Sequence, residues 1–146
     1  MKKREANSDT CILVVDDSAE TLELIKRNLE SADYQVYTAH HVQAAITLLN
    51  SVKVDTVITD LKMPGESGME LVRHVSENFK GIGILVITGF PSIQGAVESI
   101  KIGAEEYLVK SFTDTELFDA VNRVLSKVAG SKKENSNKST PQNFGI

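Results

Sequence analysis

The sequence predicts an α/β fold in which helices cover both faces of a parallel five-stranded sheet. Five short apolar runs rich in β-branched residues alternate with stretches whose apolar residues recur at helical spacing. Strands that alternate with helices and have short connections form an open, mostly parallel sheet, because right-handed crossovers allow few other arrangements. A chain of 146 residues can bury one sizeable core, so we expect one domain.

The five apolar runs are the expected strands. In chain order they span residues 11–15, 35–39, 54–59, 84–88 and 106–109. The first, third and fourth runs are apolar nearly throughout, which is typical of strands that are covered on both faces of a parallel sheet.

Each expected helix has an apolar face that can pack against this sheet. The five faces, in chain order, are Leu22, Ile25 and Leu29; Val42, Ala45, Ile46 and Leu49; Leu71, Val72 and Val75; Ile93, Ala96, Val97 and Ile100; and Leu117, Phe118, Val121, Val124, Leu125 and Val128.

Capping residues predict where some of these helices begin and end. Ser67 precedes Glu70, and Thr113 precedes Glu116, at the spacing of a capping box, so the third and fifth helices should begin there. Gly103 and Gly130 are the expected stops of the last two helices. We therefore divide the chain into an N-terminal extension (1–9), the folded domain (10–129), and a disordered tail or linker rich in Ser, Asn and Lys (130–146).

Composition excludes several classes of function. The net charge of -4 gives no field that attracts nucleic acid, so direct DNA binding by this chain is not expected. The basic start is followed by only five apolar residues, too few for a signal peptide or a membrane span, which predicts a cytoplasmic protein. Cys11 is the only cysteine, so no internal disulfide can form.

The carboxyl ends of the expected strands carry the candidate site. In open α/β sheets, ligands bind outside these ends. Asp16 and Asp17 follow the first strand, Asp60 follows the third, Thr88 ends the fourth, and Lys110 follows the fifth. Three carboxylates, a hydroxyl and an ammonium group should therefore converge at one edge of the sheet.

This set of side chains predicts Mg²⁺-assisted phosphoryl transfer. Two carboxylates about 4 Å apart repel by about 4 kcal/mol at an effective dielectric constant near 20, so a cation must compensate them. Mg²⁺ binds through one or two carboxylates and accepts phosphate oxygens, and Lys110 adds a positive charge. Asp60 stands alone, whereas Asp16 and Asp17 are paired as a metal site requires. Asp60 is therefore the candidate nucleophile, which would become an acyl phosphate.

Four segments make the sequence resemble the receiver domains of bacterial two-component response regulators. They are ILVVDDS with Asp16 and Asp17, VITDLKMPGESG with Asp60, VITG with Thr88, and GAEEYLVK with Tyr107 and Lys110. The resemblance extends over nearly all of residues 11–128. It implies the flavodoxin-like (CheY-like) fold, a doubly wound (βα)5 sheet with strand order 2-1-3-4-5.

The resemblance also implies a role for each site residue. Asp60 is the phosphoacceptor and, with Asp17, a direct Mg²⁺ ligand; Asp16 acts on the metal mainly through water. The backbone carbonyl of Lys62 is the third protein ligand. Lys110 holds one phosphoryl oxygen.

Thr88 and Tyr107 form the implied switch. Upon phosphorylation of Asp60 the Thr88 hydroxyl moves to bond the phosphoryl group, and Tyr107 turns inward into the vacated space. This changes the surface formed by the fourth helix, fifth strand and fifth helix, through which a homodimer is also possible. The implied phosphodonor is a sensor histidine kinase, and the domain is a switch, not an enzyme that turns over a separate substrate.

One position departs from the family pattern. Ser111 follows Lys110 where the family has Pro after a cis peptide bond. A cis bond before Ser would cost about 2.5–4 kcal/mol. We therefore predict a trans bond, a slightly shifted loop, and a Lys110 side chain that still reaches the site.

The output of the switch has two alternatives, and a different class of protein is also possible. The segments DLKMPGESGMELV and TGFPSIQGAVESIKIGAEEYL are most similar to receivers of NtrC-type transcription activators; the alternative is a single-domain regulator that acts through protein contacts. The other class is a phosphatase with an aspartyl-phosphate intermediate. Such a nucleophile is normally followed two residues later by a second Asp, where this chain has Lys62.

Overall fold

The computed structural model describes residues 9–63 and 66–139. Residues 1–8 of the expected N-terminal extension, Pro64 of the family motif, and residues 140–146 of the expected tail lie outside the described residues. The elements, in chain order, are β1 (Cys11–Val15), α2 (Ala19–Ser31), β2 (Gln35–Ala39), α3 (Val42–Ser51), β3 (Thr56–Asp60), β4 (Lys62–Met63), β5 (Glu66–Ser67), α4 (Gly68–Asn78), β6 (Gly83–Thr88), α5 (Ile93–Lys101), β7 (Glu106–Val109) and α6 (Asp114–Ser139).

The main sheet has the predicted topology. Five parallel strands lie in the order β2-β1-β3-β6-β7, which is 2-1-3-4-5 when only these strands are counted, so the predicted fold class is confirmed. β1, β2 and β7 have the predicted bounds. β3 begins two residues later than predicted and includes Asp60, and β6 begins one residue earlier.

The register of the sheet places the strand ends side by side. Val15 lies opposite Thr59, Asp60 opposite Ile87, and Thr88 opposite Val109. Because these pairs are the last or next-to-last residues of their strands, the side chains that follow them emerge at one edge. The register therefore brings the candidate site residues together.

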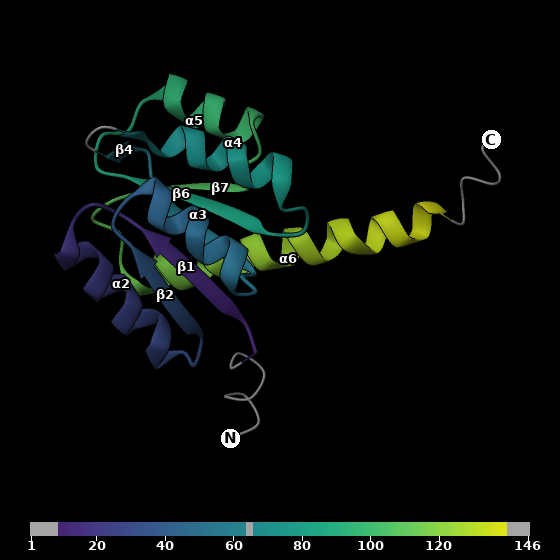
Figure 1. The fold of residues 1–146 in the computed structure, drawn as a ribbon, viewed down its shortest axis with the longest axis horizontal. Coiled ribbons are helices and arrows are strands. Elements are labelled where there is room, and N and C mark those ends of the chain that lie inside the picture. Colours follow the sequence, from purple (N-terminus) through teal and green to yellow (C-terminus); the bar gives the residue numbers. More distant parts are fainter. Residues whose placement is uncertain (1–8, 64–65, 140–146) are drawn as a thin grey trace.

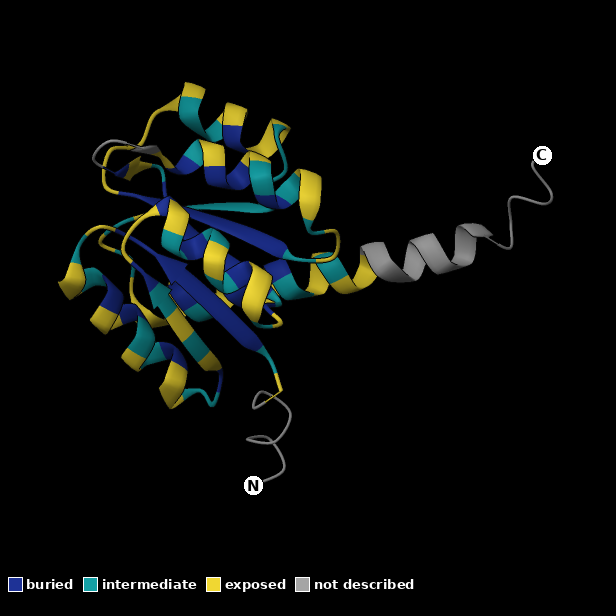
Figure 2. Ribbon diagram, in the orientation of Figure 1, coloured by how far each residue is buried: buried dark blue, intermediate teal, exposed yellow. Residues whose placement is uncertain are grey.

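Helices cover both faces of the sheet (Figure 1). The apolar faces of α2 and α6 form one core cluster with Ile12, Val14, Ile58, Leu85 and Ile87. α3 and α4 form the other cluster with Leu13, Val15, Val57, Ile84 and Val86. The central strands β1, β3 and β6 are buried along their whole length, as Figure 2 shows, so they give the site a rigid base.

The apolar face predicted for the fourth helix exists but does not cover the sheet. Ile93, Val97 and Ile100 of α5 are 86%, 48% and 47% exposed, and Ser99 is the buried residue of this helix. α5 packs beside β7 at the edge of the sheet, where the side chains of β7 are themselves at most half-buried. There is little apolar sheet surface for the stripe to cover, so the expectation that this face is buried is wrong.

The helix stop predicted at Gly130 is also wrong. The backbone of α6 continues through Gly130 to Ser139, so residues 130–139 of the expected tail belong to a helix. A glycine inside a helix costs only about 1 kcal/mol relative to alanine, and it ends a helix only where the next residues favour another conformation. The Lys and Glu residues that follow are good helix formers, so the chain has no local reason to stop.

The other predicted caps agree with the structure more closely. The Thr113 hydroxyl accepts a hydrogen bond from the Glu116 N–H (3.1 Å), and the Glu116 carboxylate accepts one from the Thr113 N–H (2.8 Å), which is a complete capping box. Ser67 also caps α4, but its hydroxyl accepts a hydrogen bond from the Met69 N–H (3.1 Å) and not from the Glu70 N–H, as the predicted capping box requires. Gly103 ends α5 with a left-handed φ of 130°, as predicted.

The pair of short strands β4 and β5 was not predicted from the sequence. Lys62 pairs with Ser67 and Met63 with Glu66 in an antiparallel arrangement between β3 and α4. Each strand has only two residues, so neither carries a hydrophobic period that a sequence pattern could reveal.

Among the described helices, none combines the length and the apolar character that crossing a bilayer requires.

Candidate functional site

Asp16 lies at the carboxyl end of β1 and is completely buried. Its N–H donates to the Ala39 carbonyl (3.2 Å), which continues the pairing of β1 with β2. Its Oδ1 atom accepts a hydrogen bond from the Ser18 N–H (2.9 Å), and Ser18 in turn caps α2 by accepting from the Thr21 N–H (3.2 Å). The Asp16 carboxylate is thus fixed between a strand end and a helix start, while the neighbouring Asp17 is exposed.

Asp60 is the last residue of β3 and is 4% exposed. Its Oδ1 atom accepts from the Lys62 N–H (3.0 Å), and its Oδ2 atom accepts from Lys110 Nζ (2.8 Å). Gly68 is required beside it, because a Cβ atom on Gly68 would lie 1.9 Å from the Asp60 carbonyl oxygen. The Gly68 N–H also donates to the Leu61 carbonyl (2.9 Å), so the start of α4 holds the loop after Asp60 in place.

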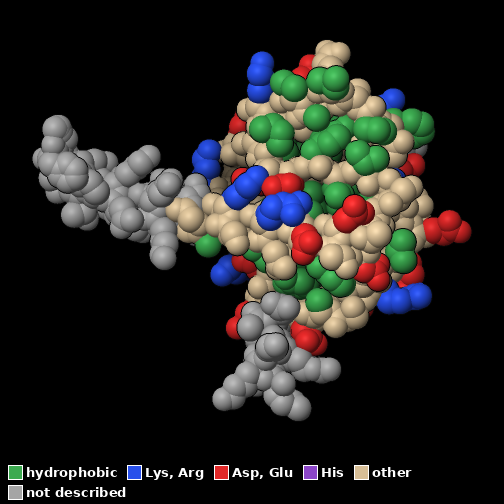
Figure 3. Space-filling model, turned by 180° about the vertical axis from the view of Figure 1, so that it is seen from behind, with side chains coloured by type: hydrophobic (Ala, Val, Ile, Leu, Met, Phe, Trp, Pro, Cys, Tyr) green, Lys and Arg blue, Asp and Glu red, His purple; other side chains and the backbone are tan. Residues whose placement is uncertain are grey.

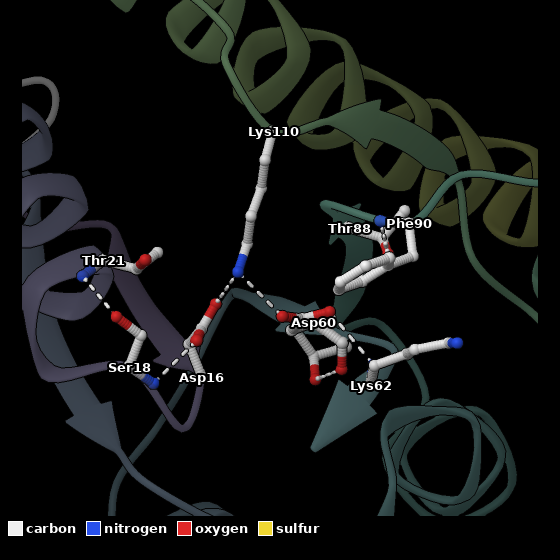
Figure 4. A network of polar contacts seen from close by, with 9 residues as sticks. Asp16, Ser18, Thr21, Asp60, Lys62, Thr88, Phe90 and Lys110 are labelled. Carbon is white, nitrogen blue, oxygen red and sulfur yellow. Dashed lines mark hydrogen bonds and ion pairs between the residues drawn. The ribbon is translucent and has the colours of Figure 1, made fainter.

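Lys110 follows β7 and connects the two carboxylates. Lys110 Nζ lies 2.8 Å from Asp60 Oδ2 and 3.0 Å from Asp16 Oδ2, and Figure 4 shows the side chain pointing between them. The Lys110 N–H donates to the Thr88 carbonyl (2.8 Å), which extends the pairing of β7 with β6. Since the structure has no cis peptide bond among the described residues, the predicted trans Lys110-Ser111 bond is confirmed. Ser111 has a left-handed φ of 79°, which turns the chain toward α6 in place of a cis bond.

The three carboxylates form the group that the sequence predicts as a metal site. One oxygen from each of Asp16, Asp17 and Asp60 lies within 4.8 Å of the others. Burial raises the pKa of Asp16 above its usual value, although the Ser18 N–H and Lys110 oppose this. Burial lowers the pKa of Lys110, but its contacts with Asp60 and Asp16 outweigh this, and the net shift is upward. Lys110 therefore remains charged and offsets only part of the negative charge.

These residues fit a hard divalent cation. The Asp16 Oδ2 atom is buried, and it shares the Lys110 ammonium with Asp60 Oδ2, at distances of 3.0 and 2.8 Å from Nζ. Three carboxylates that lie close together and share one ammonium group provide the oxygen ligands that Mg²⁺ binds. Asp16, Asp17 and Asp60 would hold the ion, and the role of the Lys62 carbonyl stays a prediction.

Thr88 and Tyr107, the predicted switch residues, lie on the neighbouring strands β6 and β7 and line one open pocket. Thr88 is completely buried, and its hydroxyl oxygen accepts from the Phe90 N–H (3.1 Å). The Tyr107 hydroxyl oxygen accepts from the Ser92 N–H (3.3 Å) at the start of α5. The pocket has a volume of about 560 Å³ and is also lined by Lys62, Met63 and Phe90. There is thus space beside Thr88 into which an aromatic side chain can move.

Three features of the site were missed from the sequence: the close approach of Gly68 to Asp60, the left-handed Ser111, and a contact between the Lys62 ammonium and the Phe90 ring. The first two depend on the path of a loop in space. A signal for the third existed, because Lys62 and Phe90 each follow a site residue by two positions on neighbouring strands.

Asp16→Asn is expected to stabilise the protein when divalent cations are absent. A raised pKa means that ionised Asp16 costs folding free energy at neutral pH, whereas the amide can still accept from the Ser18 N–H. We expect the melting temperature at pH 7 to rise by about 2–4 °C, the shift that 1 kcal/mol produces in a chain of this size. The difference should shrink as the pH falls through the raised pKa of Asp16, because the Asp16 carboxyl group of the folded wild type then also becomes neutral.

Calorimetry in a chelating buffer measures this difference, with Asp119→Asn at an exposed position of α6 as the control. A lower melting temperature for Asp16→Asn at pH 7 would show that burial does not make the ionised Asp16 carboxylate costly for folding. Added Mg²⁺ should stabilise the wild type more than the variant, because the variant offers the cation one carboxylate less.

Comparisons with known proteins agree with this geometry. Residues 12–122 match the family model described as response regulator receiver domain. The chain is 31% identical over 125 residues to the phosphate regulon transcriptional regulatory protein PhoB of Pseudomonas aeruginosa, an alignment that covers 84% of this chain and 55% of PhoB. The chain spans about half the length of the curated relatives it matches.

Solved structures show the same fold. The chemotaxis protein CheY4 of Vibrio cholerae is 31% identical, with a TM-score of 0.76 over 80% of this chain and 98% of that one. A response regulator receiver domain protein from Clostridium thermocellum is 34% identical, with a TM-score of 0.74 over 81% of this chain and 95% of that one. The sequence of the site, its geometry and both kinds of comparison therefore agree.

Proposed function

Since the chain belongs to the response regulator receiver domain family, we propose that it is a cytoplasmic phosphorylation switch in which a sensor histidine kinase transfers a phosphoryl group to Asp60. The observation that carries this proposal is the position of Asp60 at the end of a buried strand. One of its carboxylate oxygens contacts the Lys110 ammonium, and Asp16 and Asp17 lie beside it. A nucleophile, a cation site and a fixed positive charge are the parts that phosphoryl transfer needs.

The proposed transfer forms one bond and breaks one. A carboxylate oxygen of Asp60 attacks phosphorus, and the bond from phosphorus to the donor nitrogen of the kinase histidine breaks. Its electron pair stays on the histidine, and Asp60 becomes an acyl phosphate. A bound Mg²⁺ supplies positive charge beside the phosphoryl oxygens. Lys110, already 2.8 Å from Asp60 Oδ2, is placed to hold a phosphoryl oxygen.

The response proceeds through Thr88 and Tyr107. In the unphosphorylated arrangement the Thr88 hydroxyl oxygen accepts a hydrogen bond from the Phe90 N–H. When Asp60, at the end of the neighbouring strand, is phosphorylated, the Thr88 O–H can donate to a phosphoryl oxygen. Movement of this hydroxyl toward Asp60 opens space for Tyr107 in the adjoining pocket. Two discrete arrangements of Thr88 and Tyr107 are thus biased by one local charge.

The exposed apolar face of α5 is the proposed output surface. Figure 3 shows hydrophobic side chains gathered on the upper part of the molecule, where α5 lies. Ile93, Val97 and Ile100 of α5 and Val109 of β7 are all at least 44% exposed. Several exposed apolar side chains on one helix and the adjacent strand are typical of a protein-binding surface. We propose that it binds the output partner or a second receiver, and that its shape changes when Tyr107 moves.

The proposed output is control of transcription through a further domain. The relative PhoB is a transcriptional regulatory protein, and this chain corresponds to about half of its length. The NtrC-type assignment made from the sequence stays a prediction. The alternative is a single-domain regulator that acts by protein contact, which is supported by the match of this chain to 98% of the solved CheY4 chain.

The phosphatase class is disfavoured by the residue two positions after Asp60. There the chain has Lys62, whose side chain points away from Asp60 in Figure 4 and lies over the Phe90 ring. It offers no carboxyl group that could protonate a leaving alcohol. We therefore propose that the domain catalyses only its own phosphorylation and dephosphorylation.

Metal dependence tests the proposed transfer. Incubation with a small acyl phosphate and Mg²⁺ is expected to add the mass of one phosphoryl group to the intact protein. In a chelating buffer the adduct should be absent, because the charges of Asp16, Asp17 and Asp60 then repel the phosphodonor. Intact-protein mass spectrometry measures both samples, and an equal adduct with and without Mg²⁺ would contradict the proposed chemistry.

A further inference from the structure

Two segments at the mouth of the site, β4 after Asp60 and the loop after Thr88, are connected by residues that neither bind the proposed metal through a side chain nor receive the phosphoryl group. The Lys62 N–H donates to Asp60 Oδ1 (3.0 Å), and the Phe90 N–H donates to Thr88 Oγ1 (3.1 Å). In each segment, the backbone N–H of the second residue after the site residue is thus hydrogen-bonded to the side chain of that site residue. The anchors lie on the adjacent strands β3 and β6.

The side chains of the two anchored residues meet. Lys62 Nζ lies 5.2 Å from the centre of the Phe90 ring, within the range of a cation–π interaction. Phe90 is 70% exposed, so this contact with Lys62 is not explained by burial in the core. Figure 4 shows Lys62 pointing away from Asp60, in contrast to Lys110. A continuous chain of contacts therefore runs from Asp60 through Lys62 and Phe90 to Thr88.

We propose that the Lys62–Phe90 contact is a latch that holds the resting arrangement of Thr88 and so lowers the affinity of the site for a phosphoryl group. This inference rests on the proposed function. With the ring held on Lys62, the Phe90 N–H stays close to Thr88 Oγ1 and keeps that hydroxyl in its present position.

Two effects of phosphorylation should open the latch. The Thr88 hydroxyl turns toward the phosphoryl oxygens, so the Phe90 N–H loses its acceptor and the Phe90 loop is released. The added negative charge also attracts the Lys62 ammonium. This attraction competes with the weak attraction between the ammonium and the quadrupole of the Phe90 ring. Both effects favour separation of Lys62 from Phe90, so the contact belongs to one of the two states and biases their populations.

Removal of the ring should therefore tighten binding of a phosphoryl analogue. The probe is beryllofluoride with Mg²⁺, and the variant is Phe90→Leu, which keeps an apolar side chain. We expect its affinity to rise about two- to fivefold, the factor that corresponds to an exposed cation–π contact. Phe90→Tyr, which keeps a ring, is the matched control and should bind like the wild type. Because Phe90 is largely exposed, neither substitution should prevent folding.

A double-mutant cycle with Lys62→Gln isolates the contact from the charge of Lys62. Lys62→Gln alone also weakens the general attraction of the anion, so only the effect of Phe90→Leu in each background is compared. The latch predicts that Phe90→Leu tightens binding in the wild type and has no effect when Lys62 is already Gln. An unchanged affinity for Phe90→Leu, or the same gain in both backgrounds, would overturn the latch. If the wild type and Asp60→Asn bind the probe equally, the proposed function itself fails.

Discussion

The Asp60→Asn variant is expected to form no phosphoryl adduct with either a small acyl phosphate or a cognate kinase. The amide has nearly the size of the carboxylate, and its oxygen can still accept the hydrogen bond from the Lys62 N–H. An amide nitrogen is not a nucleophile at neutral pH, however, and the neutral group removes one of the three charges that hold the cation. The loss should therefore be complete while the fold is retained.

Asp119→Asn is a suitable control for this loss. Asp119 is exposed on α6, outside the group of carboxylates that can hold a metal. Intact-protein mass after incubation with the phosphodonor and Mg²⁺ should show one adduct for Asp119→Asn and none for Asp60→Asn. A full adduct on Asp60→Asn would remove Asp60 from its role.

The Lys110→Met variant is expected to accept a phosphoryl group about 10²- to 10³-fold more slowly than the wild type, the usual cost of removing one fixed group that stabilises developing charge. Methionine resembles the unbranched apolar stem of lysine but lacks the ammonium group, whose nitrogen lies 2.8 Å from Asp60 Oδ2 and 3.0 Å from Asp16 Oδ2. The three carboxylates then lose their nearest positive partner, so Mg²⁺ should bind at least as tightly as in the wild type. The defect should appear in the transfer step.

The transfer rate and the Mg²⁺ affinity can be measured separately to check this. The rate comes from the time course of the adduct at saturating Mg²⁺, and the affinity from titration without phosphodonor. Lys101→Met, at the end of α5, is the control for loss of a lysine outside the site. An unchanged transfer rate for Lys110→Met would show that the contacts of Lys110 serve only the stability of the fold.

The site could be predicted from the sequence because it depends on strand ends. Four site residues lie at or just after the ends of parallel strands: Asp16, Asp60, Thr88 and Lys110. Because the register of the sheet places these strand ends side by side, the four residues must lie at one common edge. The trans Lys110-Ser111 bond could be predicted for a similar reason, since it follows from a general cost of the cis form before any residue except proline.

The features that could not be predicted depend on what surrounds an element. The stripe of Ile93, Val97 and Ile100 has helical spacing, but spacing does not tell whether a helix lies over the sheet or at its edge. Gly68 is recognisable only when α4 is seen to begin against the Asp60 carbonyl. Gly130 is an ordinary stop signal whose small cost the following residues overcome.

Identification of the phosphorylated residue decides whether Asp60 is the phosphoacceptor. Borohydride reduces an acyl phosphate to an alcohol, so the modified carboxylate is marked permanently and can be located by peptide mass spectrometry. After phosphorylation of the wild type in Mg²⁺, we expect the reduced residue to be Asp60 and expect Asp16 and Asp17 to be unchanged. A reduced Asp16 or Asp17, with Asp60 intact, would contradict this expectation.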